Sequence, residues 1–251
     1  MRLATAAFIS ATTMFTLSPA AQQQPAPAIA VLASGAVEGS IAALKSTLPP
    51  ASSRFETSQG LADRLSSGEA PDVLIAQAAM IEGLVNKGRA IADSRQPLGR
   101  IPIGVAASAG AARPDVSTVD ALKTAILAAD AIVISRGASG TLLENTFRDL
   151  GIADSVEAKL RRESRGDDVM KTLGESHANA IGFTMVSEIK YGERYGGRYV
   201  GLLPDALQRY TSYDAVVLTA SRRPDAARAF VRALVAPEAQ RVFAQNGWLR
   251  P

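Results

Sequence analysis

The stretch Ile29-Ala-Val-Leu-Ala-Ser-Gly-Ala36 decides the fold. Its apolar beginning predicts a short buried strand, which breaks at Ala33–Ala36. Apolar residues then recur at helical spacing over Val37–Leu48, and Pro49–Pro50 ends the predicted helix. A strand that leads directly into a helix is the repeating unit of a parallel α/β sheet.

The same unit recurs along the chain. Further strands are predicted at Arg54–Thr57, Asp72–Ile75, Arg100–Ala107, Ala131–Ser135, Ala180–Thr184 and Tyr213–Thr219. Further helices are predicted at Met80–Asn86, Val119–Ala128, Thr141–Leu150, Asp167–Leu173, Pro224–Leu234 and Pro237–Asn246. The pattern predicts two α/β lobes, residues 28–104 plus 206–251 and residues 105–205. Two crossover connections, near Arg100–Ala107 and Leu203–Tyr213, leave a ligand cleft that can close by hinge motion.

Length and composition exclude several classes of protein. The chain of 251 residues is enough for one large domain or two small ones. A net charge of +3 is too small to indicate nucleic-acid binding by itself. Because there is no cysteine and only one histidine, His177, disulfides, thiolate metal sites and multi-histidine zinc sites are excluded. We therefore predict neither a metal nor a cofactor.

The N-terminus is typical of an export signal. A short basic start, Met1–Leu3, precedes the apolar run Ala4–Leu17, and Ser18–Ala20 supplies the small residues of a cleavage site. A bilayer span needs about 20 apolar residues, so this run is too short to be one. The alternative, a buried N-terminal helix, fits poorly with the Gln- and Pro-rich stretch Gln22–Pro27. We expect residues 1–20 to be removed near Ala20, leaving a monomeric periplasmic protein without a membrane span.

Polar residues follow the predicted strands where ligands usually bind. In parallel α/β sheets this is the edge beyond the carboxyl ends of the strands, where helix N-termini present free N–H groups. The candidate binding residues at these ends are Ser34, Gly35, Ser58, Gln59, Ser135, Arg136, Ser139, Gly140 and Thr184. Hydroxyl and N–H donors suit an anion, and the Arg136 guanidinium could add a fork for a carboxylate. The alternative is that these residues are ordinary helix caps.

Several segments together resemble the periplasmic molybdate-binding proteins of ABC importers. They are Val31–Ala36, Ala70–Ile75, Ser135–Gly140, Ile181–Phe183, Pro224–Phe230 and Pro237–Gly247, spread over nearly the whole mature chain. The resemblance implies a type II periplasmic-binding-protein fold of two lobes. It also implies that hydroxyls and backbone amides of both lobes hold an oxyanion without a metal, at Ser34, Ser58 and the Ser135–Ser139 loop.

One departure concerns the ligand. Met185 stands where these proteins usually carry a tyrosine, and its thioether cannot donate a hydrogen bond. The segment Phe183–Glu188 is similar instead to a divergent branch, some of whose members handle small organic acids such as aconitate. We therefore expect Met185 at the site and either a molybdate-type oxyanion or a small organic acid as the ligand.

Two functions from different classes follow. The first is a binding protein that captures the anion and delivers it to an ABC permease; a sensor partner is a variant of it. The second is an isomerase of an aconitate-like acid on the same scaffold, with Glu38 or Glu188 as the base. No other catalytic residue is predicted. The cluster Arg161–Arg165 is interpreted as a solvated segment, with the alternative that Arg165 borders the cleft. The segment with the tyrosines around Tyr195 is interpreted as a hairpin or loop.

Overall fold

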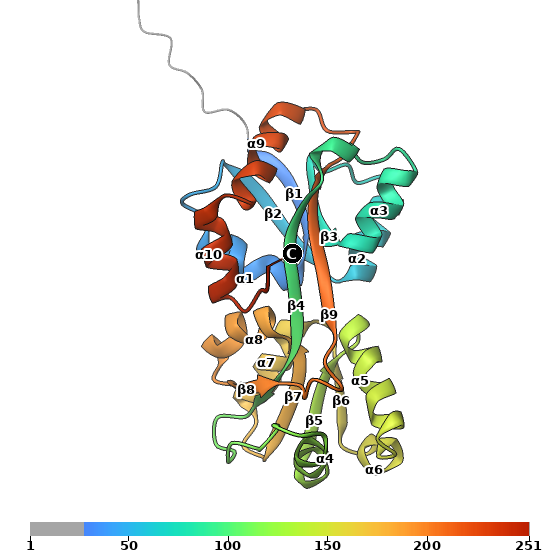
Figure 1. The fold of residues 1–251 in the computed structure, drawn as a ribbon, viewed down its shortest axis with the longest axis vertical. Helices are drawn as coiled ribbons and strands as arrows, with labels where there is room; N and C mark the ends of the chain where they lie inside the picture. Colours follow the sequence, from blue (N-terminus) through green and yellow to red (C-terminus); the bar gives the residue numbers. More distant parts are fainter. Residues whose placement is uncertain (1–27, 251) are drawn as a thin grey trace, which may run out of the picture.

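The chain forms two α/β lobes joined by a pair of long strands. The computed structural model describes residues 28–250, and the predicted export signal lies outside them. Strands β4 (Gln96–Ala107) and β9 (Tyr210–Val217) run side by side and are antiparallel. Figure 1 shows β4 passing from the upper lobe into the lower one, with β9 beside it. The predicted two-lobed α/β fold with two connections is thereby confirmed.

Lobe 1, the upper one in Figure 1, is built on the strand order β2-β1-β3-β9-β4. Its strands are β1 (Ile29–Ser34), β2 (Ala51–Glu56) and β3 (Val73–Gln77), and β1 is parallel to both neighbours. Its helical segments are η1 (Gly35–Val37), α1 (Glu38–Ala43), α2 (Ser58–Ser66), α3 (Ala78–Asn86), η2 (Ala92–Ser94), α9 (Pro224–Leu234) and α10 (Pro237–Gln245). Helices therefore follow each of the three parallel strands, as the strand–helix pattern predicts.

Lobe 2 continues the sheet in the order β4-β7-β5-β6, and β8 pairs with β4. Its strands are β5 (Ala131–Ser135), β6 (Leu160–Glu163), β7 (Ala180–Met185) and β8 (Arg198–Leu202). Its helical segments are α4 (Val119–Ala128), α5 (Ala138–Asp149), α6 (Ala153–Glu157), α7 (Gly166–Glu175), α8 (Val186–Gly192) and η3 (Glu193–Tyr195). Strand β5 is parallel to both β6 and β7, so lobe 2 repeats the parallel core of lobe 1.

The core consists of strands buried on both faces. Every residue of β5 and of β7 is buried, because helices cover both sides of the sheet. Across this core the Phe147 ring of α5 meets the Phe183 ring of β7 edge to face, with centroids 6.1 Å apart. Within residues 28–250 no helix is long and apolar enough to cross a membrane.

Two local predictions are wrong, and one strand was not predicted. Helix α8, the helical turn η3 and strand β8 replace the predicted hairpin or loop around Tyr195. Strand β6 overlaps Arg161–Arg165 and was not predicted, although Arg161 is exposed, as expected for a solvated segment. Both strands are paired on one side only and carry charged residues, so their apolar signal is weak. The predicted helix over Val37–Leu48 is shorter than expected, because α1 ends at Ala43 and turns follow.

Candidate functional site

A small cavity lies where the two lobes meet. It has a volume of about 50 Å³ and is lined from both lobes. Its lining residues are Ser34, Gly35, Glu56, Thr57, Ser58, Gln77, Ser135, Gly137, Ser139, Ser164, Arg165, Gly166, Met185, Glu188 and Tyr213. Hydroxyl, amide, carboxyl and guanidinium groups dominate this set, so the cavity is suited to a polar ligand of small size.

Helix N-termini converge on this cavity. The residues that precede η1, α2, α3, α5, α7 and α8 all line it, and they are Ser34, Thr57, Gln77, Gly137, Arg165 and Met185. Only the hydroxyls of Ser34 and Thr57 accept a hydrogen bond from their own helix. The other four helices begin without a side-chain cap, which leaves their first N–H groups available to a ligand. Since each N-terminus carries partial positive charge, their convergence favours an anion.

Tyr213 supplies a hydroxyl from the connecting strand β9. Its side chain is 3% exposed, and its ring packs edge to face on Trp248, with centroids 5.5 Å apart. Burial raises the pKa of the Tyr213 hydroxyl and the neighbouring Glu188 adds to this effect, whereas hydrogen bonds with Ser34 and Gln77 oppose it. Because the net shift is upward, Tyr213 stays protonated and can donate a hydrogen bond in the cavity.

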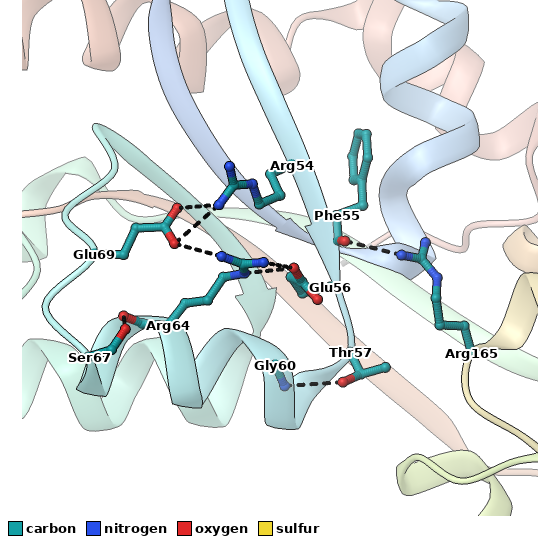
Figure 2. A network of polar contacts seen from close by, with 9 residues as sticks. All are labelled: Arg54, Phe55, Glu56, Thr57, Gly60, Arg64, Ser67, Glu69 and Arg165. Atoms are coloured by element: carbon teal, nitrogen blue, oxygen red, sulfur yellow. Dashed lines mark hydrogen bonds and ion pairs between the residues drawn. The ribbon is translucent and has the colours of Figure 1, made fainter.

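Arg165 reaches from the start of α7 across to lobe 1. Its guanidinium pairs with Glu38 of α1 at 2.8 Å and donates to the Phe55 carbonyl at 3.1 Å, and within lobe 2 it pairs with Asp167 at 2.9 Å. Figure 2 shows the guanidinium pointing toward the Phe55 carbonyl. Burial lowers the pKa of Arg165, but Asp167 and Glu38 raise it and prevail. The guanidinium is therefore a fixed positive charge at the cavity wall.

Glu188 places a carboxyl group in the same wall. It accepts hydrogen bonds from the Thr184 hydroxyl and from the Met185 N–H, at the end of β7 directly before α8. The carboxyl fits against Gly166, where a Cβ atom would lie 2.0 Å from its Oε2. Burial raises the pKa of Glu188, and although the two hydrogen bonds oppose this, the net shift is upward. Glu188 is therefore easier to protonate than an exposed glutamate.

Glu56 is a second carboxyl group in the wall, contributed by lobe 1. Its Oε1 receives Nε of Arg64 at 2.6 Å, and Arg64 also pairs with Glu69 at 3.0 Å. Figure 2 shows one carboxylate oxygen of Glu56 turned to Arg64 while the other points away from it. The Glu69 carboxylate also forms an ion pair with Arg54 at 3.4 Å. Arg54, Glu56, Arg64 and Glu69 thus form one network of charged residues behind the cavity.

The structure brings six of the predicted binding residues into the cavity wall: Ser34, Gly35, Ser58, Ser135, Ser139 and Met185. The Ser135 and Ser139 hydroxyls share a hydrogen bond of 2.9 Å. Of the two predicted candidate bases, Glu188 lines the cavity. Glu38 does not, and its carboxylate is paired with Arg165.

Four predicted residues do not line the cavity. The Gln59 amide turns to Asp63 at 2.8 Å, and Arg136 is exposed on the surface. Thr184 is buried behind the wall, where its hydroxyl bonds to Glu188. At Gly140 a Cβ atom would lie 1.6 Å from the Ser135 carbonyl oxygen, so this glycine lets α5 start close to β5.

Sequence reasoning missed Thr57, Gln77, Ser164 and Tyr213, and it left Arg165 open. Thr57 is a typical N-cap residue and directly precedes the predicted Ser58, so its place at the start of α2 could have been predicted from the sequence. Gln77 is not a typical cap, and Tyr213 faces the cavity only because β9 crosses between the lobes. A sequence pattern alone does not reveal such a placement.

A two-lobed α/β fold with a polar cavity at the strand ends defines the class of type II periplasmic binding proteins. The family model for bacterial extracellular solute-binding proteins matches residues 51–249, and the chain belongs to that family. The expected resemblance to periplasmic molybdate-binding proteins is confirmed for the fold.

The relatives are named for different small anions. The aconitate isomerase of a Pseudomonas species is 31% identical over 245 residues, which cover 93% of this chain and 92% of that protein. The periplasmic molybdate-binding protein of Azotobacter vinelandii has a TM-score of 0.71 at 18% identity, over 89% of this chain and 99% of that chain. The sulfate-binding protein SubI of Mycobacterium tuberculosis H37Rv has a TM-score of 0.69 at 16% identity, over 88% and 86%. The two structural likenesses show the fold alone.

Proposed function

We propose that this chain is a periplasmic receptor that captures a small organic acid between its lobes and delivers it to an ABC permease. The convergence of helix N-termini on the cavity carries the proposal. Four of these helices, α2, α3, α5 and α7, have at least 9 residues and present an N-terminus with about half a positive charge each. Together with the hydroxyls of both lobes, they can hold an anion without a metal.

Three features favour a carboxylate over an inorganic oxyanion. The fork of the Arg165 guanidinium matches the two oxygens of a carboxylate. Met185, which lines the cavity, cannot donate a hydrogen bond to an oxyanion. The relative at 31% identity bears the name of an enzyme that acts on aconitate, a small tricarboxylic acid. A cavity of about 50 Å³ holds only a few waters, so a di- or tricarboxylate requires the lobes to move apart by the hinge motion expected of this fold.

A thermal-shift titration of the chain from Ala21 onward tests the receptor proposal. Its ligands are citrate, malate, succinate, trans-aconitate, molybdate and sulfate. A ligand at a hundredfold excess over Kd adds about 2.7 kcal/mol to the free energy of unfolding, so at least one carboxylate should raise Tm clearly. Combining Ser34→Ala with Ser139→Ala should abolish the shift, whereas the exposed Ser67→Ala should not. Stabilisation by molybdate or sulfate alone would contradict the proposal.

Glu188 supports a second candidate function, an isomerase of an unsaturated acid. Its carboxylate form can take a proton from the carbon next to a double bond, and its acid form can return that proton to the far end of the shifted double bond. The reaction leaves proton and charge counts unchanged. An upward shift of the Glu188 pKa suits both steps, because it brings the carboxyl closer to the operating pH, where one group can serve as base and acid in turn. Arg165 could stabilise the charge that develops on the substrate carboxylate.

Proton NMR of cis- or trans-aconitate incubated with the protein tests the second candidate. In D₂O, isomerisation through an exchangeable carboxyl should place deuterium in the product. Glu188→Gln should abolish turnover while leaving ligand binding measurable, and the exposed Glu175→Gln should turn over normally. A protein that binds aconitate without interconverting its isomers is a receptor and not an isomerase.

A further inference from the structure

Glu56 is the second carboxyl group of the cavity lining, besides Glu188, and it is the one that lobe 1 contributes. It lies at the end of β2, directly before the N-terminus of α2, and its side chain is 25% exposed. Its Oε1 is occupied, because Nε and Nη2 of Arg64 each lie 2.6 Å from it. In the part of the chain that the structure describes, Oε2 has no hydrogen-bond partner. This second oxygen faces away from Arg64 in Figure 2 and lies near Gly60 at the start of α2, and Glu56 is one of the residues that line the cavity.

The positive charges near Glu56 are already paired with other carboxylates. Arg165, the cation in the lining, is already balanced by Glu38 and Asp167. Arg64 is shared by Glu56 and Glu69, so the network behind the wall leaves no spare positive charge beside Glu56. An anion that presents only acceptor oxygens would therefore be repelled by the negative charge on Glu56 Oε2. A ligand hydroxyl that donates a hydrogen bond to this oxygen would replace the repulsion with an attractive contact.

We propose that Glu56 makes the cavity selective for hydroxy acids, whose hydroxyl donates to Glu56 Oε2 while a carboxylate is held at Arg165 and the helix N-termini. This inference rests on the proposed capture of an organic acid and names the kind of acid. Anions made only of acceptors, such as molybdate, sulfate and ionised aconitate, lack the donor and are disfavoured. A site built to pair a ligand hydroxyl rejects analogues without it, since a polar group of the site is then left unpaired.

Matched ligand pairs that differ by one hydroxyl test the inference. Calorimetric titrations compare malate with succinate and citrate with tricarballylate at neutral pH. The wild-type protein is expected to prefer the hydroxy acid of at least one pair by about tenfold or more in Kd. Glu56→Gln keeps the side-chain volume but removes the charge, so the preference should fall to within about threefold, and succinate or tricarballylate should bind more tightly than before.

Glu69→Gln is the matched control. It removes a carboxylate from the same arginine network without touching the cavity lining, so the hydroxyl preference should remain. Equal affinity for both members of each pair, or tighter binding of trans-aconitate than of citrate, would overturn the inference and leave the receptor proposal standing. A wild-type protein that binds none of these carboxylates would overturn the receptor proposal itself. The wild-type comparison decides the matter even if Glu56→Gln does not fold.

Discussion

The guanidinium of Arg165 lies 2.8 Å from the carboxylate of Glu38, and this ion pair joins the start of α7 in lobe 2 to the start of α1 in lobe 1. A second contact lies beside it, where the Ser187 hydroxyl donates to the Ala36 carbonyl at 2.7 Å. Both bridges cross between the lobes next to the cavity. The group that we expect to bind the ligand carboxylate is therefore also a group that holds the lobes together.

Arg165→Lys should weaken carboxylate binding by about tenfold or more. A lysine ammonium keeps the charge but cannot serve Glu38, the Phe55 carbonyl and a ligand with one planar fork. Calorimetric titration with the tightest carboxylate checks this prediction. Arg161→Lys, an exposed arginine on the neighbouring strand β6, should bind like the wild type. Equal affinities of the two variants would show that Arg165 acts as a lobe contact and does not touch the ligand.

Tyr213→Phe should lower ligand affinity and barely change stability. The phenylalanine ring keeps the packing on Trp248, while the hydroxyl beside Ser34 and Gln77 is lost. The loss of one hydrogen bond predicts a change of about 0.5–1.5 kcal/mol in the binding free energy. Tyr210→Phe, at an exposed position on the same strand, serves as the control for the substitution itself. A Tyr213→Phe variant with unchanged Kd would remove Tyr213 from the binding site.

We expect the wild-type protein to lose stability as pH rises because of Glu188, and a glutamine at this position removes that dependence. Because the pKa of Glu188 is raised in the folded protein, the folded state binds more protons than the unfolded state above pH ~4.3. The free energy of unfolding therefore falls as pH rises through the window between the unfolded and folded pKa values. Glu188→Gln removes this contribution, so its stability relative to wild type should increase as pH rises above the unfolded pKa of about 4.3.

Urea denaturation of both proteins across that range gives the measurement. Glu175→Gln, at an exposed glutamate near the end of α7, should keep a constant difference from wild type. A constant difference for Glu188→Gln as well would mean that folding does not raise the pKa of Glu188. In that case Glu188 could not deliver a proton to a substrate.

The architecture was predictable because its signals are local. A strand such as Ala131–Ser135 and a helix such as Val119–Ala128 are encoded in consecutive residues, and both have the bounds predicted. The serines and the glycine predicted at strand ends make up a third of the cavity lining, and they were predictable for the same reason. Tyr213 and Arg165 could not be placed in this way. They reach the cavity from a connecting strand and from the loop before α7, and their position depends on how the two lobes meet.

The two strands that were not predicted have a common physical cause. Edge strands gain pairing on one side only, and solvent faces them on the other, so β6 and β8 tolerate charged residues such as Arg161 and Arg198. Their apolar periodicity is correspondingly poor. Arg136 shows the opposite error, because a cation beside a strand end looked suitable for a ligand, yet its side chain points into solvent.

Asp72→Asn should lower the free energy of unfolding by about 2–3 kcal/mol at neutral pH. The buried carboxylate accepts the Ala30 N–H at 2.8 Å and the Ser221 hydroxyl at 2.7 Å, and it pairs with Arg223 at 2.9 Å. Burial raises the pKa of Asp72, but these three partners lower it and prevail. This stability is present above the unfolded pKa of about 3.9 and is lost as pH falls through the lower folded pKa.

Urea titrations at neutral pH and at about pH 3 measure the two limits. The gap between Asp72→Asn and wild type should narrow at the acidic end, since both side chains are then uncharged in the unfolded state and increasingly so in the folded one. Asp149→Asn, at an exposed position, should stay within about 0.5 kcal/mol of wild type throughout. A gap that widens toward acid would contradict the lowered pKa.

Gly166→Ala should destabilise the protein and weaken ligand binding together. The new Cβ would lie 2.0 Å from Oε2 of Glu188, so the carboxyl or the first turn of α7 must move, at a cost of about 1–3 kcal/mol. Gly83→Ala is the matched control in α3, where a Cβ meets no atom within 4 Å and alanine should stabilise the helix by about 0.5–1 kcal/mol.

Combining Gly166→Ala with Glu188→Ala tests whether the destabilisation comes from a collision with the Glu188 carboxyl. Removing the Glu188 carboxyl makes room for the new methyl group, so the two substitutions should cost less together than the sum of their separate effects. Urea midpoints of the four proteins of this cycle give the coupling. Additive effects would mean that the Gly166 methyl collides with something other than Glu188, and that the carboxyl does not rest against the start of α7.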